Sequence, residues 1–258
     1  MRLGSKSQLG FSLVELAIVM LIMGLVLGGL AMPLAVQREN ARIRDGDTQL
    51  EIVRDAVEGF ALVNGFLPCP ATPASDGLAS TSGGGCTERH GFVPATTLDV
   101  GGSRNGDNLL LDPWGSPLRY SVTASDADGN GNWDFTTPGE MSAVTMPILQ
   151  PDLVVCSSAT GSSATACASA NVTLSDQSPV VIYSLGKDWT SFSSTDQLEN
   201  VGATLGGGAT GASYPVAADD VFVSRGRSDG GGNAFDDQLL WLSANALYRH
   251  MIEAGRLP

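Results

Sequence analysis

The chain begins with a long apolar stretch, and an amphipathic stretch follows it. Residues 16–36 carry no charged side chain, and a run of this length is sufficient for a helix to cross a bilayer. A secretory signal would have a shorter apolar core with a cleavage site at its far end, whereas an arginine-rich helical segment follows here without a break. The pattern therefore predicts a membrane-spanning segment that remains on the protein.

Beyond this stretch, apolar residues recur at helical spacing among charged ones. They are separated by steps of 7, 3, 4 and 3 residues and form one face of a helix: Ile43, Leu50, Val53, Val57 and Phe60. The pair Asn64-Gly65 is a typical helix stop. We therefore expect one helix over residues 11–63 whose second half packs on the rest of the protein, with Gly46 as its weakest point.

From residue 64 onward, short β-type runs alternate with polar, glycine-rich stretches. The clearest predicted strands are 118–123, 180–185, 220–223 and 239–242. The last segment opens with a candidate cap at Ser243 and stops at Gly255, which predicts a C-terminal helix of about eleven residues. Residues 64–258 are thus expected to form one α+β domain.

Composition narrows the range of functions. Against 27 Asp and Glu there are 14 Lys and Arg, and the net charge of −13 makes the chain a poor general binder of nucleic acid. The 32 glycines and 13 prolines indicate a loop-rich domain. The only histidines are His90 and His250, and the G-x-S-x-G, H-E-x-x-H and G-x-x-x-x-G-K motifs do not occur. We therefore do not expect an enzyme.

The start of the apolar stretch carries the most specific motif. Residues 10–16, Gly-Phe-Ser-Leu-Val-Glu-Leu, follow a short basic leader and precede about twenty apolar residues. This arrangement resembles the class III signal of type IV pilins and pseudopilins. The resemblance implies that prepilin peptidase removes residues 1–10 by cutting between Gly10 and Phe11, and that the new amino group of Phe11 is N-methylated. Residues 11–36 would remain as the transmembrane segment and become the filament core.

Glu15 lies at the edge of the apolar stretch, where an unpaired carboxylate in hydrocarbon costs about a few kcal/mol. In the pilin interpretation its partner is the amino group of Phe11 on a neighbouring subunit, so that the pair forms only after cleavage and only in a filament. The alternative is that Glu15 sits in the first helical turn, favoured by the helix dipole, and reaches the lipid headgroups.

Two further motifs extend the resemblance into the C-terminal domain. Residues 112–120, Asp-Pro-Trp-Gly-Ser-Pro-Leu-Arg-Tyr, and residues 182–186, Ile-Tyr-Ser-Leu-Gly, resemble in the same order the turn-and-strand signatures of the major pseudopilin of type II secretion. The resemblance implies a pilin-like α+β fold, with the long helix packed on a small antiparallel sheet and a short C-terminal helix. The first motif is a turn to which we assign no chemistry. Insertions within 120–183 and 186–236 depart from the family.

The four cysteines lack the spacing of a zinc site and fit two disulfides in an oxidising compartment. Of the three connectivities, pairing of sequence neighbours is the simplest: Cys69 with Cys86, and Cys156 with Cys167. Each pair brackets a loop rich in small residues.

Two acidic segments are candidates for calcium. The first places oxygen ligands at positions 1, 3, 5 and 9 of an EF-type loop: Asp126, Asp128, Asn130 and Asp134. Position 12 is Thr137 instead of the bidentate glutamate, which predicts weak binding. A metal-free hairpin turn rich in Asn and Gly is the alternative.

The second segment, residues 228–237, resembles the acidic loop that major pseudopilins use for calcium. The resemblance implies Asp236 and Asp237 as carboxylate ligands and Leu185 as a carbonyl ligand. We expect Ca²⁺ at this loop or, alternatively, at the first.

Together these features predict a structural subunit of a type II secretion pseudopilus, which assembles through its N-terminal helix to support protein export. Its expected partners are other pilin or pseudopilin subunits, prepilin peptidase, the inner-membrane assembly platform and, before assembly, membrane lipid. No nucleic acid is expected. The chain would cross the inner membrane once, with its globular domain in the periplasm, and would lie in a filament at or beyond the cell envelope after assembly.

Two alternatives remain open. The chain could be a minor subunit of a type IV pilus whose inserted loops bind a surface or a ligand. It could also be a membrane-anchored periplasmic binding domain that never polymerises.

Overall fold

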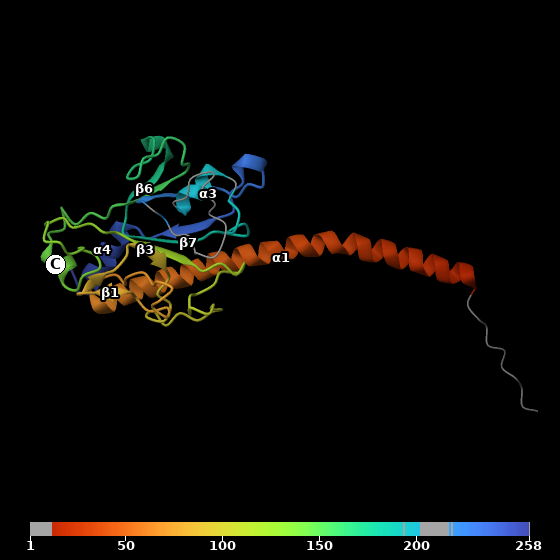
Figure 1. Cartoon of the computed structure of the whole chain (residues 1–258), viewed down its shortest axis with the longest axis horizontal. Helices are drawn as coiled ribbons and strands as arrows, with labels where there is room; N and C mark the ends of the chain where they lie inside the picture. Colours follow the sequence, from red (N-terminus) through yellow and green to blue (C-terminus); the bar gives the residue numbers. More distant parts are fainter. Residues whose placement is uncertain (1–11, 193, 202–216, 218, 258) are drawn as a thin grey trace, which may run out of the picture. The chain divides into compact units, whose positions relative to one another are not determined.

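The computed structural model describes residues 12–192, 194–201, 217 and 219–257 (Figure 1), and for residues 27–34 and 231 it describes the backbone alone. The chain divides into two compact units, residues 1–44 and 45–258. Helix α1 (Leu13–Asn64) contributes to both units. The structure is α+β, as the sequence predicts, with a long N-terminal helix and antiparallel strand pairs.

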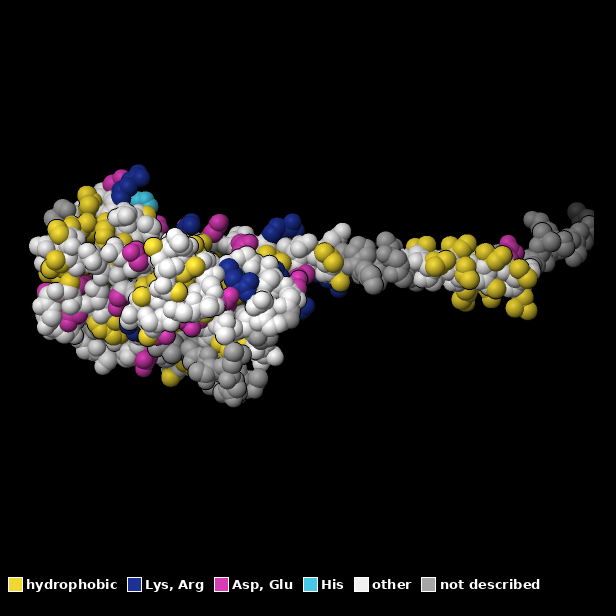
Figure 2. Space-filling model, turned by 90° about the horizontal axis from the view of Figure 1, so that it is seen from above, with side chains coloured by type: hydrophobic (Ala, Val, Ile, Leu, Met, Phe, Trp, Pro, Cys, Tyr) yellow, Lys and Arg dark blue, Asp and Glu magenta, His cyan; other side chains and the backbone are white. Residues whose placement is uncertain are grey.

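Over residues 13–26, the first unit exposes its apolar side chains. Figure 2 shows hydrophobic side chains along the N-terminal part of α1, and the side chain of Leu13 is 85% exposed. The described part of the chain contains no helix that combines the length and the apolarity needed to cross a membrane. The side chains of residues 27–34, which belong to the predicted membrane span, lie outside the described residues.

The second unit buries the predicted face of α1. Leu50, Val53 and Val57 are buried in the main core. The expected last member, Phe60, lies half-buried against Phe66, with the ring centroids 5.6 Å apart in an edge-on arrangement. Ala61, four residues after Val57 on the same face of the helix, is buried in the main core instead.

The helix ends where the sequence indicates but does not weaken where we expected. Gly65, with φ of +83°, follows the last helical residue in the left-handed conformation that a helix stop requires. Gly46 is buried inside a continuous α1, so the prediction of a weak point there was wrong. A side chain at Gly46 would place its Cβ 2.0 Å from Oε1 of Gln238, which shows that this glycine allows close packing.

Four antiparallel strands form the main sheet. They run in the order β3 (His90–Phe92), β4 (Arg119–Val122), β7 (Val180–Ser184) and β9 (Gln238–Trp241). Alternate residues of β7 face opposite sides of the sheet. Val180 and Ile182 enter the main core with α1 and with α4 (Ala244–Glu253), whereas Val181 and Tyr183 enter a second core on the other side.

A second sheet departs from the predicted single antiparallel sheet. Its order is β6 (Thr173–Ser178), β5 (Leu153–Cys156) and β8 (Val221–Val223), and the β5–β8 pair is parallel. The predicted strand 220–223 belongs to this sheet and not to the main one. The second core lies between the two sheets and includes Leu153, Val155 and Phe222. The predicted insertions therefore contribute to a packed layer of their own.

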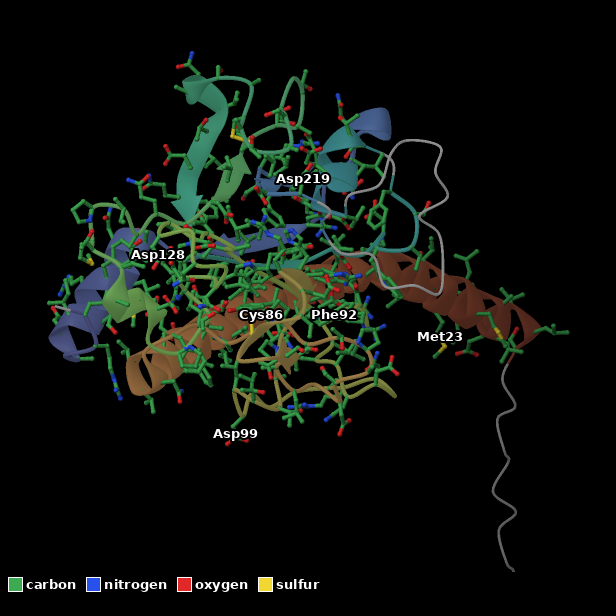
Figure 3. All side chains as sticks on the ribbon, turned by 60° about the vertical axis from the view of Figure 1, so that its left-hand side comes forward. Met23, Cys86, Phe92, Asp99, Asp128 and Asp219 are labelled. Carbon is green, nitrogen blue, oxygen red and sulfur yellow. A yellow bond between two sulfur atoms is a disulfide. The ribbon has the colours of Figure 1, made fainter. Side chains whose placement is uncertain are left out.

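Short elements complete the C-terminal unit. They are β1 (Thr81–Ser82), β2 (Gly85–Cys86), α2 (Glu140–Ala143), η1 (Ala170–Val172), α3 (Thr195–Asn200) and η2 (Gly231–Asn233). The C-terminal helix α4 begins after Ser243, whose side chain makes no capping hydrogen bond, and Gly255 with φ of +68° follows its end. The structure joins sequence neighbours by disulfides, Cys69 to Cys86 (Figure 3) and Cys156 to Cys167.

Candidate functional site

The processing residues Gly10 and Phe11 lie outside the described residues. Glu15 occupies the first turn of α1 and is exposed. Its neighbours on the helix surface include Val14 and Ile18, which are themselves more than half exposed. A carboxylate is thus presented on an apolar helix surface, where a cationic group brought by another molecule would neutralise it.

The Asp-Pro-Trp-Gly turn is organised by the carboxylate of Asp112. Its Oδ1 accepts hydrogen bonds from the amides of Trp114 (2.9 Å) and Ser116 (2.8 Å), and Gly115 has φ of +87°. Oδ2 accepts a hydrogen bond from the hydroxyl of Ser184 at the end of β7. Burial raises the pKa of Asp112, and these hydrogen bonds oppose the rise. The turn is structural, in agreement with its sequence pattern.

The structure contains two clusters of three carboxylate side chains among the described residues. One consists of Asp188, Asp236 and Asp237, and the other of Asp126, Asp128 and Asp134. In each group, one oxygen of every carboxylate lies within 4.8 Å of one oxygen of the other two. We call the first the C-terminal cluster and the second the loop cluster.

In the C-terminal cluster, Asp236 and Asp237 precede β9 and are both buried. Oδ2 of Asp236 accepts a hydrogen bond from the amide of Lys187 (2.7 Å), just after β7. A side chain at Gly186 would place its Cβ 2.6 Å from Cγ of Asp236, so only glycine allows this approach. The end of β7 is therefore held directly against the acidic pair.

Helix α3 supplies amide side chains to the same cluster. Nε2 of Gln197 donates to Asp188 (2.8 Å) and to Asp236 (3.0 Å), and Nδ2 of Asn200 donates to Oδ2 of Asp237 (2.7 Å). The other oxygen of Asp237, Oδ1, is buried and has no hydrogen-bond partner in the described part of the chain. A buried oxygen without a partner is costly, and a cation would satisfy it.

Burial and mutual repulsion raise the pKa values of two carboxylates in the C-terminal cluster. Burial and then the neighbouring Asp236 raise the pKa of Asp188 to about 6. Burial raises the pKa of Asp237 well above its usual value, while the hydrogen bond from Asn200 acts in the opposite direction. Three carboxylates with two raised pKa values form a site that an oxygen-preferring cation would stabilise.

Of the three residues predicted for this cluster, the structure brings two carboxylates together and turns the third side chain into the core. Asp236 and Asp237 lie in it, and the side chain of Leu185 is buried in the second core beside it. Asp188 was missed, although it follows the Ile-Tyr-Ser-Leu-Gly motif by two residues. That closeness in sequence to Leu185 was the available signal.

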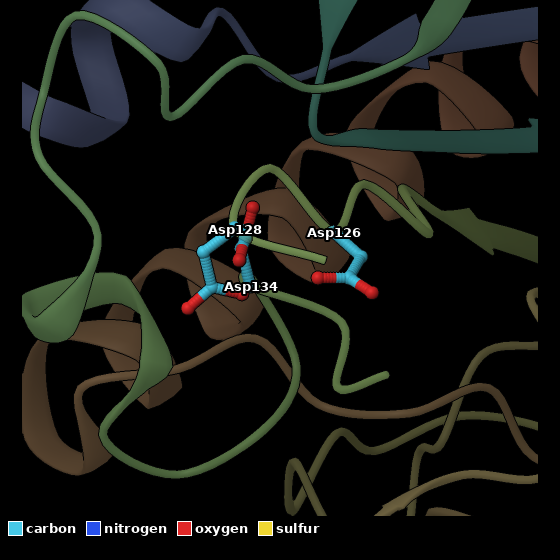
Figure 4. A group of neighbouring side chains, drawn as sticks. All are labelled: Asp126, Asp128 and Asp134. Atoms are coloured by element: carbon cyan, nitrogen blue, oxygen red, sulfur yellow. The ribbon is translucent and has the colours of Figure 1, made fainter. Parts of the chain in front are cut away.

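The loop cluster is built by one short segment (Figure 4). Asp126 accepts from the amides of Asn130 (3.1 Å) and Gly131 (2.9 Å), which lower its pKa. Asp128 accepts from the amide of Asn130 (3.2 Å), and Asp134 accepts through Oδ2 from the amide of Ala127 (2.9 Å). The loop predicted from the EF-type spacing therefore folds with its three aspartates together.

The arrangement of His90 and Ser121 does not suit catalysis. Nδ1 of His90 lies 2.9 Å from Oγ of Ser121, but Ser121 is fully buried within the sheet. Burial and the adjacent Arg89 lower the pKa of His90 to about 3. A serine closed off from solvent cannot reach a substrate.

Comparison with known protein families gives a match in the N-terminal part of the chain. Residues 5–31 match the family of the prokaryotic N-terminal methylation motif. This match points to a type IV pilin-like subunit, of a pilus or a pseudopilus, and to a structural protein instead of an enzyme. The motif implies processing by prepilin peptidase and assembly with other pilin subunits. No curated protein and no solved structure matches the chain.

Proposed function

We propose that the chain is a structural subunit of a type II secretion pseudopilus, anchored in the inner membrane by residues 11–36 before assembly and incorporated through that segment into a filament. The observation that carries the proposal is the methylation motif at residues 5–31, whose residues 13–31 form the beginning of the 52-residue helix α1. The exposed apolar surface of the first part of α1 supports the role of this segment as a filament core.

The assembly mechanism follows from the charges at the N-terminus. Cleavage after Gly10 creates an amino group on Phe11, and Glu15 presents a carboxylate on the apolar helix surface. A pair between these groups on adjacent subunits would neutralise both as the helices leave the lipid. The globular unit would lie in the periplasm before assembly. After assembly it would lie in a filament at or beyond the cell envelope.

The assignment to type II secretion rests on the two motifs of the main sheet. Strands β4 and β7 pair with Tyr120 opposite Ile182, and Asp112 and Ser184 link the turn of the first motif to the end of the second. The two motifs therefore form one structural unit, although the chain separates them by an insertion. Calcium at the C-terminal cluster is part of this proposal, with Asp188 added to Asp236 and Asp237 as a carboxylate ligand and Leu185 as a carbonyl ligand.

A minor type IV pilus subunit is the second candidate. It is favoured by the second sheet, which packs on the main sheet through the second core and carries the Cys156–Cys167 disulfide. A packed inserted layer of this kind suits the recognition of a ligand or surface. A periplasmic anchored domain that never polymerises is the third candidate, and the tests below separate it from both.

Processing is tested first. In Gly10→Ala, mass spectrometry of the membrane fraction should find the leader retained, whereas Gly4→Ala, inside the leader, should yield a chain that begins at Phe11. Efficient production of that chain from Gly10→Ala would refute the cleavage site.

Assembly is tested by cross-linking in cells. Glu15→Val should enter the membrane and be processed but should be depleted from cross-linked filaments, whereas Glu39→Val should assemble normally. A wild-type protein that forms no cross-linked multimers would refute assembly altogether and favour the anchored domain. Deletion of the chain should abolish export of folded exoproteins if it serves secretion, and surface filaments if it serves a pilus.

A further inference from the structure

We propose that the loop cluster binds Ca²⁺ and that Glu140 supplies the carboxylate that its EF-type sequence lacks at position 12. This site is separate from the C-terminal cluster and does not depend on the role of the chain in a filament. It joins the segment 126–134 to the first residue of α2.

Asp134 provides the observation that points to an ion. Its side chain is fully buried, and its Oδ2 accepts from the amide of Ala127. Its Oδ1 is also buried, and no hydrogen-bond donor reaches it from the described residues. Since a buried carboxylate oxygen without a partner costs a substantial part of its desolvation energy, this oxygen is poised for a cation.

Glu140 is already held at the loop. Nδ2 of Asn130 donates to its Oε2 (3.0 Å), and Nδ2 of Asn132 donates to its Oε1 (3.2 Å). Both oxygens of one carboxylate are therefore turned toward the residues at positions 5 and 7 of the loop. Thr137, at position 12, lies one turn earlier, and its carbonyl accepts from the amide of Glu140 (3.2 Å). The bidentate acid of an EF-type loop is thus displaced by three residues and not lost.

The charges of the site favour a hard cation. Burial raises the pKa of Asp134, and repulsion from Asp128, Asp126 and Glu140 adds to the rise. The salt bridges found among the described residues include none to these four carboxylates. Because all the candidate ligands are oxygens on a glycine-rich loop, Ca²⁺ suits the site better than Zn²⁺ or the more rigidly coordinated Mg²⁺.

An ion bound at the loop cluster would also stabilise the attachment of the loop to the core. Phe135 follows Asp134 directly, is buried, and stacks on Tyr248 of α4 with the ring centroids 6.3 Å apart. The carbonyl of Phe135 accepts from the amide of Leu67, just after α1 (2.7 Å). Binding at Asp134 would therefore fasten the loop to the place where the end of α1 and the C-terminal helix meet the core.

The loop carries its own spectroscopic probe. Trp133 precedes Asp134, and Trp189 follows Asp188 in the other cluster. Tb³⁺ replaces Ca²⁺ at oxygen sites and emits when a nearby tryptophan is excited. We would titrate the full-length chain in detergent micelles with Tb³⁺ and then displace it with Ca²⁺. The tryptophan variants Trp133→Phe and Trp189→Phe assign the emission to one cluster or the other.

The proposal predicts emission that Ca²⁺ displaces and that Trp133→Phe removes. Asp134→Asn should abolish this signal, and Glu140→Gln should raise the Kd for Ca²⁺ by about tenfold. The matched controls Asp176→Asn and Glu88→Gln, at exposed positions, should bind as the wild type does. Circular dichroism of each variant verifies the fold, and Glu140→Gln changes a side chain outside the core.

Three results would overturn the proposal. The first is the absence of any emission component that Trp133→Phe removes, and the second is a Trp133-dependent emission that survives Asp134→Asn. The third is a Kd that is the same in Glu140→Gln and Glu88→Gln, which would remove Glu140 from the site. Repeating the titration in Asp237→Asn separates the outcomes, because loss of the C-terminal cluster should leave the Trp133-dependent signal unchanged.

Discussion

The hydroxyl of Ser184 donates a hydrogen bond to the carboxylate of Asp112, which lies 72 residues earlier in the chain. Both residues are buried. The bond fastens the Asp-Pro-Trp-Gly turn before β4 to the last residue of β7, at the end of two paired strands. The amide of Gly186, two residues after Ser184, donates a hydrogen bond to the hydroxyl of Ser184 (3.1 Å). The turn motif and the chain next to the C-terminal cluster are therefore one connected polar network.

Asp112→Ala should lower the free energy of unfolding by about 3 kcal/mol, because the amides of Trp114 and Ser116 and the hydroxyl of Ser184 lose this acceptor. Ser184→Ala removes one of these bonds and should cost about 1 kcal/mol. Urea unfolding of the full chain in detergent, followed by near-UV circular dichroism, measures both. Equal stability of the two variants would show that the turn does not depend on the carboxylate.

Gly186→Ala should destabilise the protein by more than the left-handed backbone alone explains. An added Cβ would meet Cγ and the carbonyl oxygen of Asp236, each at 2.6 Å. Gly255 is the matched control, since its φ of +68° is close to the +66° of Gly186 and a Cβ added there would meet no atom within 4 Å. Gly255→Ala should cost about 1 kcal/mol, and Gly186→Ala about 2 kcal/mol more. Equal losses in thermal unfolding would contradict the close contact.

His90 should make the protein less stable in acid. Its pKa is lowered from 6.5 to about 3 in the folded state, so between these values the unfolded chain binds a proton that the folded one does not. Stability from this group is complete above pH 6.5 and is lost as the pH falls, with the folding constant decreasing by up to about tenfold per pH unit. His90→Gln should flatten this dependence. An unchanged pH dependence of stability in His90→Gln would contradict this prediction.

Calcium should raise the melting temperature through the C-terminal cluster. Ca²⁺ at about 100 times its Kd would add about 2.7 kcal/mol to the free energy of unfolding. Asp237→Asn should remove most of this shift when the loop cluster has been disabled by Asp134→Asn, whereas Asp176→Asn should leave it intact in the same background. Thermal unfolding of the full chain with millimolar Ca²⁺ or with chelator provides the measurement. An unchanged shift in Asp237→Asn would place the ion elsewhere.

Local patterns in the sequence determined much of this protein. The methylation motif, the helix that follows and its stop at Gly65 are contiguous signals. Strands β4, β7 and β9 and the C-terminal helix were also predicted, because each is a short run with its own periodicity and end signal. The sequence also predicted that the aspartates of the loop cluster lie together, since all three fall within nine residues.

Only the tertiary structure decided which distant segments meet. Asp188 joins Asp236 and Asp237 across a long insertion, and β5 pairs in parallel with β8. Strand β6, Thr-Leu-Ser-Asp-Gln-Ser, is a polar strand at the edge of its sheet that shows little hydrophobic pattern. The sequence around Gly46 predicted a weak point in the helix, whereas in the fold Gln238 packs against this glycine. Periodicity reports the local conformation of a segment, whereas these contacts depend on how separate segments pack, a property that no short stretch of sequence contains.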